Sequence, residues 1–334
     1  MRFLLGAAAL VVIAAGLRAT AVLLIPLVLA VFLSVVTFPL VAALQERRVP
    51  RALAVLMTML AVLVILSGPS VVIVTAIRQF ASRVPDYEQR LKGVVSRSFE
   101  WLRTQDIDTS SLIAFVDPGQ VLNLMMTMLS GMATLLSLVL LVVLISSFML
   151  YEAADIRQRR PTVLPPAVRQ HVGRIAKEMQ AWLWVKTLIS LATGVVAGFW
   201  VAVLGIEFAL LWGLTAFLLN YIPNIGSLVA AFPPALLALI AYGPLWAVVV
   251  LAGYALINLA LGSLLEPYAM GRRVGLSPLV VLLSVIAWGW MWGIAGMLLS
   301  VPITMSIKIA LENAPADVRW IAHLMEGGNR TGPS

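Results

Sequence analysis

A lone carboxylate in a long uncharged stretch is the first group in this sequence that could do chemistry. Glu207 and Glu266 bracket 58 consecutive residues without a charge, and Glu266 is the only acidic residue between Glu207 and Glu312. Ionisable side chains inside apolar segments are expensive to bury, and they often mark proton or ion pathways. Glu266 is therefore a candidate for binding a proton or a cation. The alternative is a structural carboxylate at the end of an apolar segment, paired with Arg272 or Arg273.

Polar side chains gather at a break in the same uncharged stretch. Turn-forming residues interrupt it at Tyr221-Ile-Pro-Asn-Ile-Gly226. Amide and hydroxyl groups at or beside this break could bind a polar solute, and they belong to Asn220, Tyr221, Asn224 and Ser227. Asn258 precedes Glu266 by eight residues, about two helical turns, so it is a further candidate on the same helix face. The alternatives are an ordinary turn capped by asparagine, and an Asn258 amide that bonds a neighbouring helix.

Three tryptophans form another candidate site near the carboxyl-terminal end. Trp288, Trp290 and Trp292 alternate around Gly289 and precede Gly293. Indole rings commonly gather at the interface between lipid and water, which is one interpretation of this cluster. The other is a gate lined by aromatic side chains.

Composition decides which environment must position these groups. Of the 334 residues, 61% are hydrophobic and 11% are charged, and the mean hydropathy is +1.01. Soluble domains are about 25% charged, so this chain cannot coat a water-facing surface and is expected to lie in a membrane. It has no cysteine, and His171 and His323 are too few for a histidine metal centre. We expect no metal and no cofactor.

The net charge of +8 has two interpretations. No basic stripe with interleaved aromatic residues is present, which argues against nucleic-acid binding. Basic residues of membrane proteins collect on the cytoplasmic side, where they meet anionic lipids. We therefore expect membrane lipids, and no nucleic acid, as partners.

Uncharged runs predict the membrane spans. Residues 19–45 and 52–77 contain no charge, and each exceeds the roughly 20 helical residues that cross a bilayer. Residues 208–220, 227–240 and 276–288 are bounded by turn residues and are too short to cross. We predict an all-α polytopic membrane protein with about six full transmembrane helices, two re-entrant helical hairpins and an amphipathic extracytoplasmic helical segment. Broken segments of this kind often mark a transporter's solute site.

The charges also predict organisation and orientation. The turn at 46–51 and the segment 152–186 are basic, whereas 78–117 carries equal numbers of basic and acidic residues. Both termini are therefore expected in the cytoplasm, with 78–117 and Glu207 outside. The predicted parts are amino-terminal transmembrane helices (1–77), an extracytoplasmic amphipathic segment (78–121), a transmembrane helix (122–151), a basic cytoplasmic amphipathic segment (152–182), a transmembrane core with both hairpins (183–312) and a cytoplasmic tail (313–334).

Four motifs in the carboxyl-terminal half resemble a known family. They are Leu204-Gly-Ile-Glu-Phe-Ala-Leu-Leu-Trp-Gly213, Asn220-Tyr-Ile-Pro-Asn-Ile-Gly226, Leu265-Glu-Pro-Tyr-Ala-Met-Gly-Arg-Arg-Val-Gly-Leu-Ser-Pro278, and Trp288-Gly-Trp-Met-Trp-Gly-Ile-Ala-Gly296 followed by Ser300-Val-Pro302. Their order resembles that of the autoinducer-2 exporter family of bacterial membrane proteins, and the resemblance covers essentially the whole chain. It implies a homo-oligomeric transporter of the inner membrane, with a pentamer suggested.

Three functions remain open after these observations. The first is gradient-driven export of a small polar solute similar to autoinducer-2, and the second is sodium/proton antiport with Glu266 as the coupling group. The third is an oligomeric pore or membrane scaffold. An enzyme is not expected, because the sequence has no Gly-rich phosphate loop, no His-Glu-Xaa-Xaa-His and no Gly-Xaa-Ser-Xaa-Gly.

Overall fold

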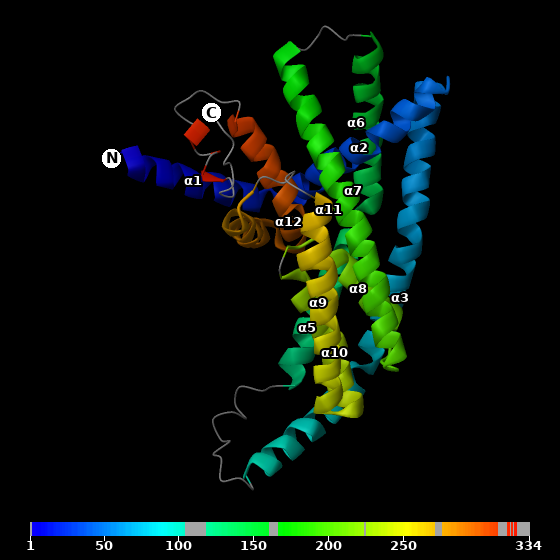
Figure 1. Ribbon diagram of the computed structural model, residues 1–334, viewed down its shortest axis with the longest axis vertical. Helices are drawn as coiled ribbons and strands as arrows, with labels where there is room; N and C mark the ends of the chain where they lie inside the picture. The colour runs from blue at the N-terminus through cyan, green and yellow to red at the C-terminus, as the bar shows by residue number, and fades with distance from the viewer. Residues whose placement is uncertain are drawn as a thin grey trace.

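The computed structural model describes residues 2–103, 118–159, 166–223, 225–270 and 276–312, together with 319–320, 322 and 324–325. These residues form helices without strands (Figure 1). The elements are α1 (Arg2–Ala19), α2 (Ala21–Glu46), α3 (Arg51–Arg103), α5 (Pro118–Ser137), α6 (Val139–Arg159), α7 (Pro166–Val203), α8 (Ala209–Leu219), α9 (Gly226–Tyr242), α10 (Pro244–Ile257), the π-helix η1 (Asn258–Leu265), α11 (Glu266–Met270) and α12 (Pro278–Glu312).

Within the part of the chain that the structure describes, six helical stretches are long and apolar enough to cross a membrane, and this confirms the predicted all-α polytopic membrane protein. They are Ala21–Glu46, Arg51–Arg97, Gly119–Ala154, Gly173–Val203, Pro244–Leu265 and Pro278–Glu312. One of them, α12, lies where the sequence predicted a hairpin.

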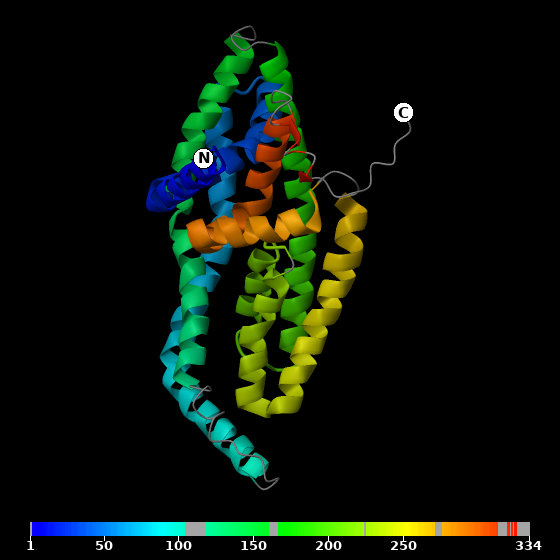
Figure 2. The ribbon, with the colours of Figure 1, turned by 90° about the vertical axis from the view of Figure 1, so that its left-hand side faces the viewer.

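The two places where hairpins were expected do contain interrupted helices. The short helices α8 and α9 are separated by a break at residues 220–225. In α12 the backbone of Gly293 has φ 61° and ψ −142°, outside the helical region. Figure 2 shows the consequence: the first half of α12 runs across the bundle, and the second half runs along it. Re-entry of either segment into a bilayer remains a prediction.

One helix, α3, includes both an expected membrane span and part of the segment expected to follow it. The expected span ended near residue 77 and an extracytoplasmic segment followed it, but α3 continues without interruption from Arg51 to Arg103. Residues 104–117 lie outside the described residues. The buried face of α3 also continues past residue 77, since Phe80, Tyr87 and Leu91 belong to the same apolar core as Ile73.

Glycines bring α7 and α8 into backbone contact. A Cβ atom on Gly194 would lie 2.7 Å from the carbonyl oxygen of Gly213 and 2.8 Å from the Cβ of Phe217. A Cβ on Gly213 would in turn meet the Cα of Gly198 at 3.1 Å. This close approach places the break after α8 directly against α7.

At one end of this core, a polar contact ties α3 to the turn before α8. Arg83 Nη1 and Tyr87 Oη each donate a hydrogen bond of 2.6 Å to Glu207 Oε2. The bond from Tyr87, and then the Arg83 guanidinium, hold the pKa of the Glu207 carboxyl below its usual value. Glu207 therefore has structural partners on α3.

The α7–α8 contact predicts opposite effects for two substitutions on the same helix. Gly194→Ala forces a methyl group into α8 and should destabilise the protein by about 1–3 kcal/mol. Gly173→Ala has nothing within 4 Å of the new Cβ, so helix propensity should stabilise it by up to about 1 kcal/mol. Melting temperatures in detergent would check this, and equal shifts for the two variants would contradict the close packing.

The Glu207 contact predicts an acid-dependent stability. Because the folded-state pKa is lowered, its contribution is fully present above the unfolded-state pKa and is lost as pH falls through the folded-state pKa. Tyr87→Phe removes the largest cause of the lowered pKa, so the stability that the variant loses relative to the wild type should be largest near pH 7 and should shrink as the pH falls. Melting temperatures between pH 3 and 7 measure this. Tyr242→Phe is the control, since its hydroxyl bonds the neutral carbonyl of Gly205 and its loss should be independent of pH.

Candidate functional site

Both helix breaks require a glycine that lies against a backbone carbonyl. At the first break, a Cβ on Gly226 would overlap the carbonyl of Leu219, the last residue of α8. At the second, a Cβ on Gly296 would overlap the carbonyl of Trp288. The chain at each break is therefore too tightly packed for any other residue type, and this explains why glycine occupies these positions in the two motifs.

A small polar cavity lies beside the first break. Its volume is about 90 Å³, and it lies between α7, the α8–α9 break, η1 and the start of α11. Its lining residues are Lys186, Asn220, Ile222, Pro223, Ser227, Asn258, Gly262, Ser263 and Glu266. Four of the sequence-predicted site residues therefore share one cavity, namely Asn220, Ser227, Asn258 and Glu266. The cavity would hold only a few water molecules or a small solute.

An ion pair forms the charged end of this cavity. Lys186 Nζ donates hydrogen bonds of 2.7 and 2.8 Å to the two carboxylate oxygens of Glu266. The Lys186 side chain is 4% exposed and that of Glu266 is 19% exposed. A buried charge is tolerated only with such a partner. Each of the two charged groups therefore lowers the free-energy cost of burying the other.

Lys186 was not expected as the partner of Glu266. It belonged to the basic stretch 152–186, and the expected structural partners were Arg272 or Arg273, which lie outside the described residues. A signal was present, because Lys186 is followed by a run of 20 residues without a charge. A lysine that begins such a run needs a counter-ion, and Glu266 was the one acid available in the apolar core.

Two further hydrogen bonds join α7 to the break. The buried Asn220 donates from Nδ2 to Ser190 Oγ at 2.9 Å, and the hydroxyls of Thr187 and Tyr221 lie 2.7 Å apart. Asn220 therefore faces the cavity with one amide hydrogen already used. Tyr221 does not line the polar cavity and lies on the opposite side of the break. Asn224 lies outside the described residues.

The π-helix η1 supplies the opposite wall. A π-helix closes i→i+5 hydrogen bonds and is frequent at functional sites. Here it carries Asn258 at its start and leads into Glu266, and both side chains line the cavity. Gly262 gives the Asn258 amide room, since a Cβ on Gly262 would lie 2.7 Å from Asn258 Oδ1.

The three tryptophans lie away from the polar cavity. Trp288 Nε1 donates to Thr304 Oγ1 at 3.2 Å, and Trp292 Nε1 donates to the carbonyl of Leu17 at 3.0 Å. The Trp290 ring is exposed and lies 4.5 Å from the Arg18 guanidinium carbon. Their contacts fasten the second break to α1 and to the second half of α12, and a gating role remains a prediction.

The cavity combines neutral hydrogen-bonding groups with one balanced ion pair. Its amides and hydroxyls can donate and accept hydrogen bonds, and its two charges cancel. Among the described residues, no group of three or more His, Cys, Asp or Glu side chains could hold a metal ion. The arrangement suits a small polar molecule, or a proton or cation that competes with Lys186 for the carboxylate.

The ion pair predicts a strong coupling between its two members. Glu266→Gln leaves the buried Lys186 without its counter-ion and should destabilise the protein by about 3–5 kcal/mol. The double variant Lys186→Met/Glu266→Gln should lose less than the sum of the two single variants. A double-mutant cycle on unfolding in detergent measures the coupling.

The exposed pair Lys92–Glu88 is the control for this cycle, with an expected coupling of about 0.3–0.5 kcal/mol. Additive effects at Lys186 and Glu266 would contradict the ion pair.

Comparison with known proteins places this arrangement in a family. The model of the AI-2E family transporter matches residues 7–316. The chain is 38% identical to the AI-2 transport protein TqsA of Escherichia coli (strain K12), over 96% of this chain and 94% of that protein. It is 34% identical to the putative transport protein YhhT of the same organism (93% and 90% covered), and 33% identical to a putative transport protein of Haemophilus influenzae (96% and 94%). The resemblance read from the four motifs is thereby confirmed, and the chain belongs to the AI-2E family of membrane transporters.

Proposed function

We propose that this transporter exports a small polar solute, similar to autoinducer-2, through the cavity between Lys186, Asn220, Ser227, Asn258 and Glu266. The observation that carries the proposal is a polar, charge-balanced cavity at the end of a broken helix within the apolar core. Uncharged polar solutes are recognised by amide and hydroxyl groups of this kind. The name of the similar protein TqsA, an AI-2 transport protein, supports a solute of this class.

The geometry also supports a way of moving the solute. The cavity wall is shared by the α7–α8 unit, which is joined by backbone contact, and by the η1–α11 segment, which is joined to it by the ion pair. Separation of these two units would open the cavity. We propose that an ion or solute gradient drives this motion in a homo-oligomer of the bacterial inner membrane, with both termini in the cytoplasm.

A second candidate, sodium/proton antiport, is favoured by the carboxylate at the cavity. Glu266 is the acidic residue of the cavity, and a cation could bind it if the Lys186 ammonium withdrew or lost its proton. In this mechanism Lys186 competes with the transported cation. In antiport Lys186 must release Glu266, whereas in solute export the ion pair can stay intact.

Proteoliposomes distinguish the candidates. The purified protein is reconstituted, flux of a labelled autoinducer-2-like solute is followed, and a pH-sensitive dye reports any sodium-driven proton movement. Export predicts solute flux without a sodium-driven pH change. Asn258→Ala should then weaken the apparent affinity by roughly tenfold or less, the expected effect of one lost hydrogen bond.

Asn123→Ala on α5 is the matched control, because Asn123 is exposed and does not line the cavity. A sodium-driven pH change without solute flux would replace export by antiport and would make Glu266→Gln the decisive variant. Solute flux that is unchanged in Asn258→Ala and Asn220→Ala would contradict the cavity as the solute site. Absence of both signals would favour a pore or scaffold.

A further inference from the structure

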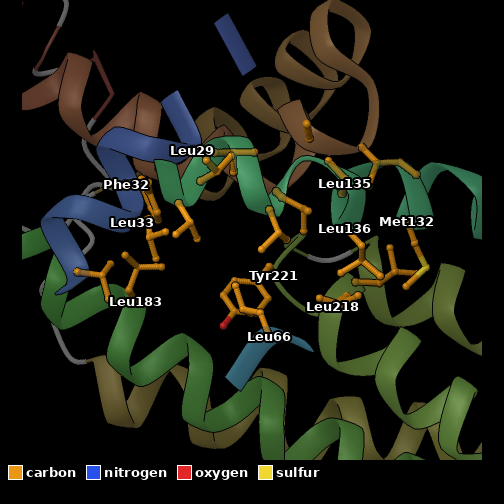
Figure 3. A pocket seen from close by; sticks show the side chains of 18 residues that line it. Leu29, Phe32, Leu33, Leu66, Met132, Leu135, Leu136, Leu183, Leu218 and Tyr221 are labelled. Atoms are coloured by element: carbon orange, nitrogen blue, oxygen red, sulfur yellow. The ribbon is translucent and has the colours of Figure 1, made fainter. Parts of the chain in front are cut away.

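A second, larger cavity lies on the other side of the first break. Its volume is about 360 Å³, within the range of ligand sites. Figure 3 shows leucine side chains from several helices around it, with the ring of Tyr221 at its edge. Whereas the polar cavity is lined by Asn220 and Ile222, this one is lined by Tyr221 between them. The short segment of the break therefore separates a polar cavity from an apolar one.

The chemistry of the lining excludes water and polar ligands. All of its residues are apolar except Tyr221, and the Tyr221 hydroxyl is directed toward α7, where it hydrogen-bonds Thr187 at 2.7 Å. A water molecule needs two to four polar partners, and a cavity without them stays dry. An empty cavity of this size would forfeit the contacts of its lining atoms. The occupant that fits is a hydrocarbon.

The surroundings identify the source of that hydrocarbon. The walls come from α2, α3, α5, α6, α7, α8 and α12, and most of these contain the stretches that are long and apolar enough to cross a membrane. The medium around these helices is the acyl-chain region of the bilayer. A lipid chain therefore needs no transfer through water to reach the cavity.

The cavity also touches both helix breaks. Leu218, Leu219 and Tyr221 contribute from the first break, and Ile294, Ala295 and Leu298 follow Gly293 at the second. A chain that fills the cavity would pack against both segments at once.

We propose that a membrane phospholipid inserts one acyl chain into this cavity, where the chain packs against both breaks and stabilises them. The lipid is then a structural ligand, distinct from any solute in the polar cavity. Its binding should be lost when a lining side chain fills the space, and retained when an adjacent side chain that faces away is enlarged by the same substitution.

Native mass spectrometry of the delipidated protein tests this proposal with a matched pair on α6. Val139 lines the cavity, and its neighbour Leu140 is 71% exposed. We expect the wild type and Leu140→Phe to retain one phospholipid, and Val139→Phe to lose it. Leu136→Phe, from another wall, should also lose the lipid, and Val139→Ala, which enlarges the cavity, should keep it.

Melting temperatures give a second readout. Added phospholipid should raise the melting temperature of the wild type and of Leu140→Phe, and this rise should be absent in Val139→Phe and Leu136→Phe, since a ligand stabilises only a state that binds it. Equal retention and equal shifts in all variants would overturn the proposal. So would a retained molecule whose mass is that of a free fatty acid or detergent.

Discussion

Interrupting a helix inside an apolar medium leaves backbone N–H and C=O groups without partners, and each unpaired group costs several kcal/mol in hydrocarbon. This constraint governs the arrangement of the carboxyl-terminal half. The break between α8 and α9 is pressed against α7, whose glycines allow backbone contact, and the break in α12 is held by indole hydrogen bonds to Leu17 and Thr304. Both breaks are therefore packed against other parts of the protein.

The same constraint explains why polar chemistry collects at the first break. A segment that must be enclosed by protein brings other helices within reach, and these helices supply Lys186 and Ser190 from α7 and Asn258 from η1. The Lys186–Glu266 pair then joins the helix that covers the break to the segment that completes the cavity. A buried ion pair is weak evidence for stability. Its position nevertheless shows that a charged contact holds α7 to α11.

The sequence predicted the parts of this structure that depend on local pattern. Uncharged runs and turn residues located the membrane helices and both interruptions, because hydrophobic length and Gly/Pro punctuation act over a few residues. The eight-residue spacing of Asn258 and Glu266 placed both on one cavity, although the intervening helix is of the π type. The charges after residue 77 suggested the end of a span, and they do not show that the helix α3 and its buried face continue past that residue.

The partner of Glu266 was beyond local reasoning, since 79 residues separate it from Lys186 and only packing decides which helices meet. The division of Asn220 and Tyr221 between two cavities was equally hidden. Outside a regular helix, the backbone angles decide which way each side chain points. No simple sequence period predicts those angles. Asn220 and Tyr221 were therefore expected at one site only because both are polar and lie at the same break.

The unbroken course of α3 has a mechanical consequence. At 1.5 Å per residue, its 53 residues span about 80 Å, and they contact α8 and α9 in the core as well as the turn at Glu207. A helix of this length passes a displacement of one end on to the other except where it bends, and Pro69 and Pro85 are the positions where bending is expected. A displacement of the Arg103 end would therefore reach the contacts with α8 and α9 only as far as bending at Pro69 and Pro85 does not absorb it.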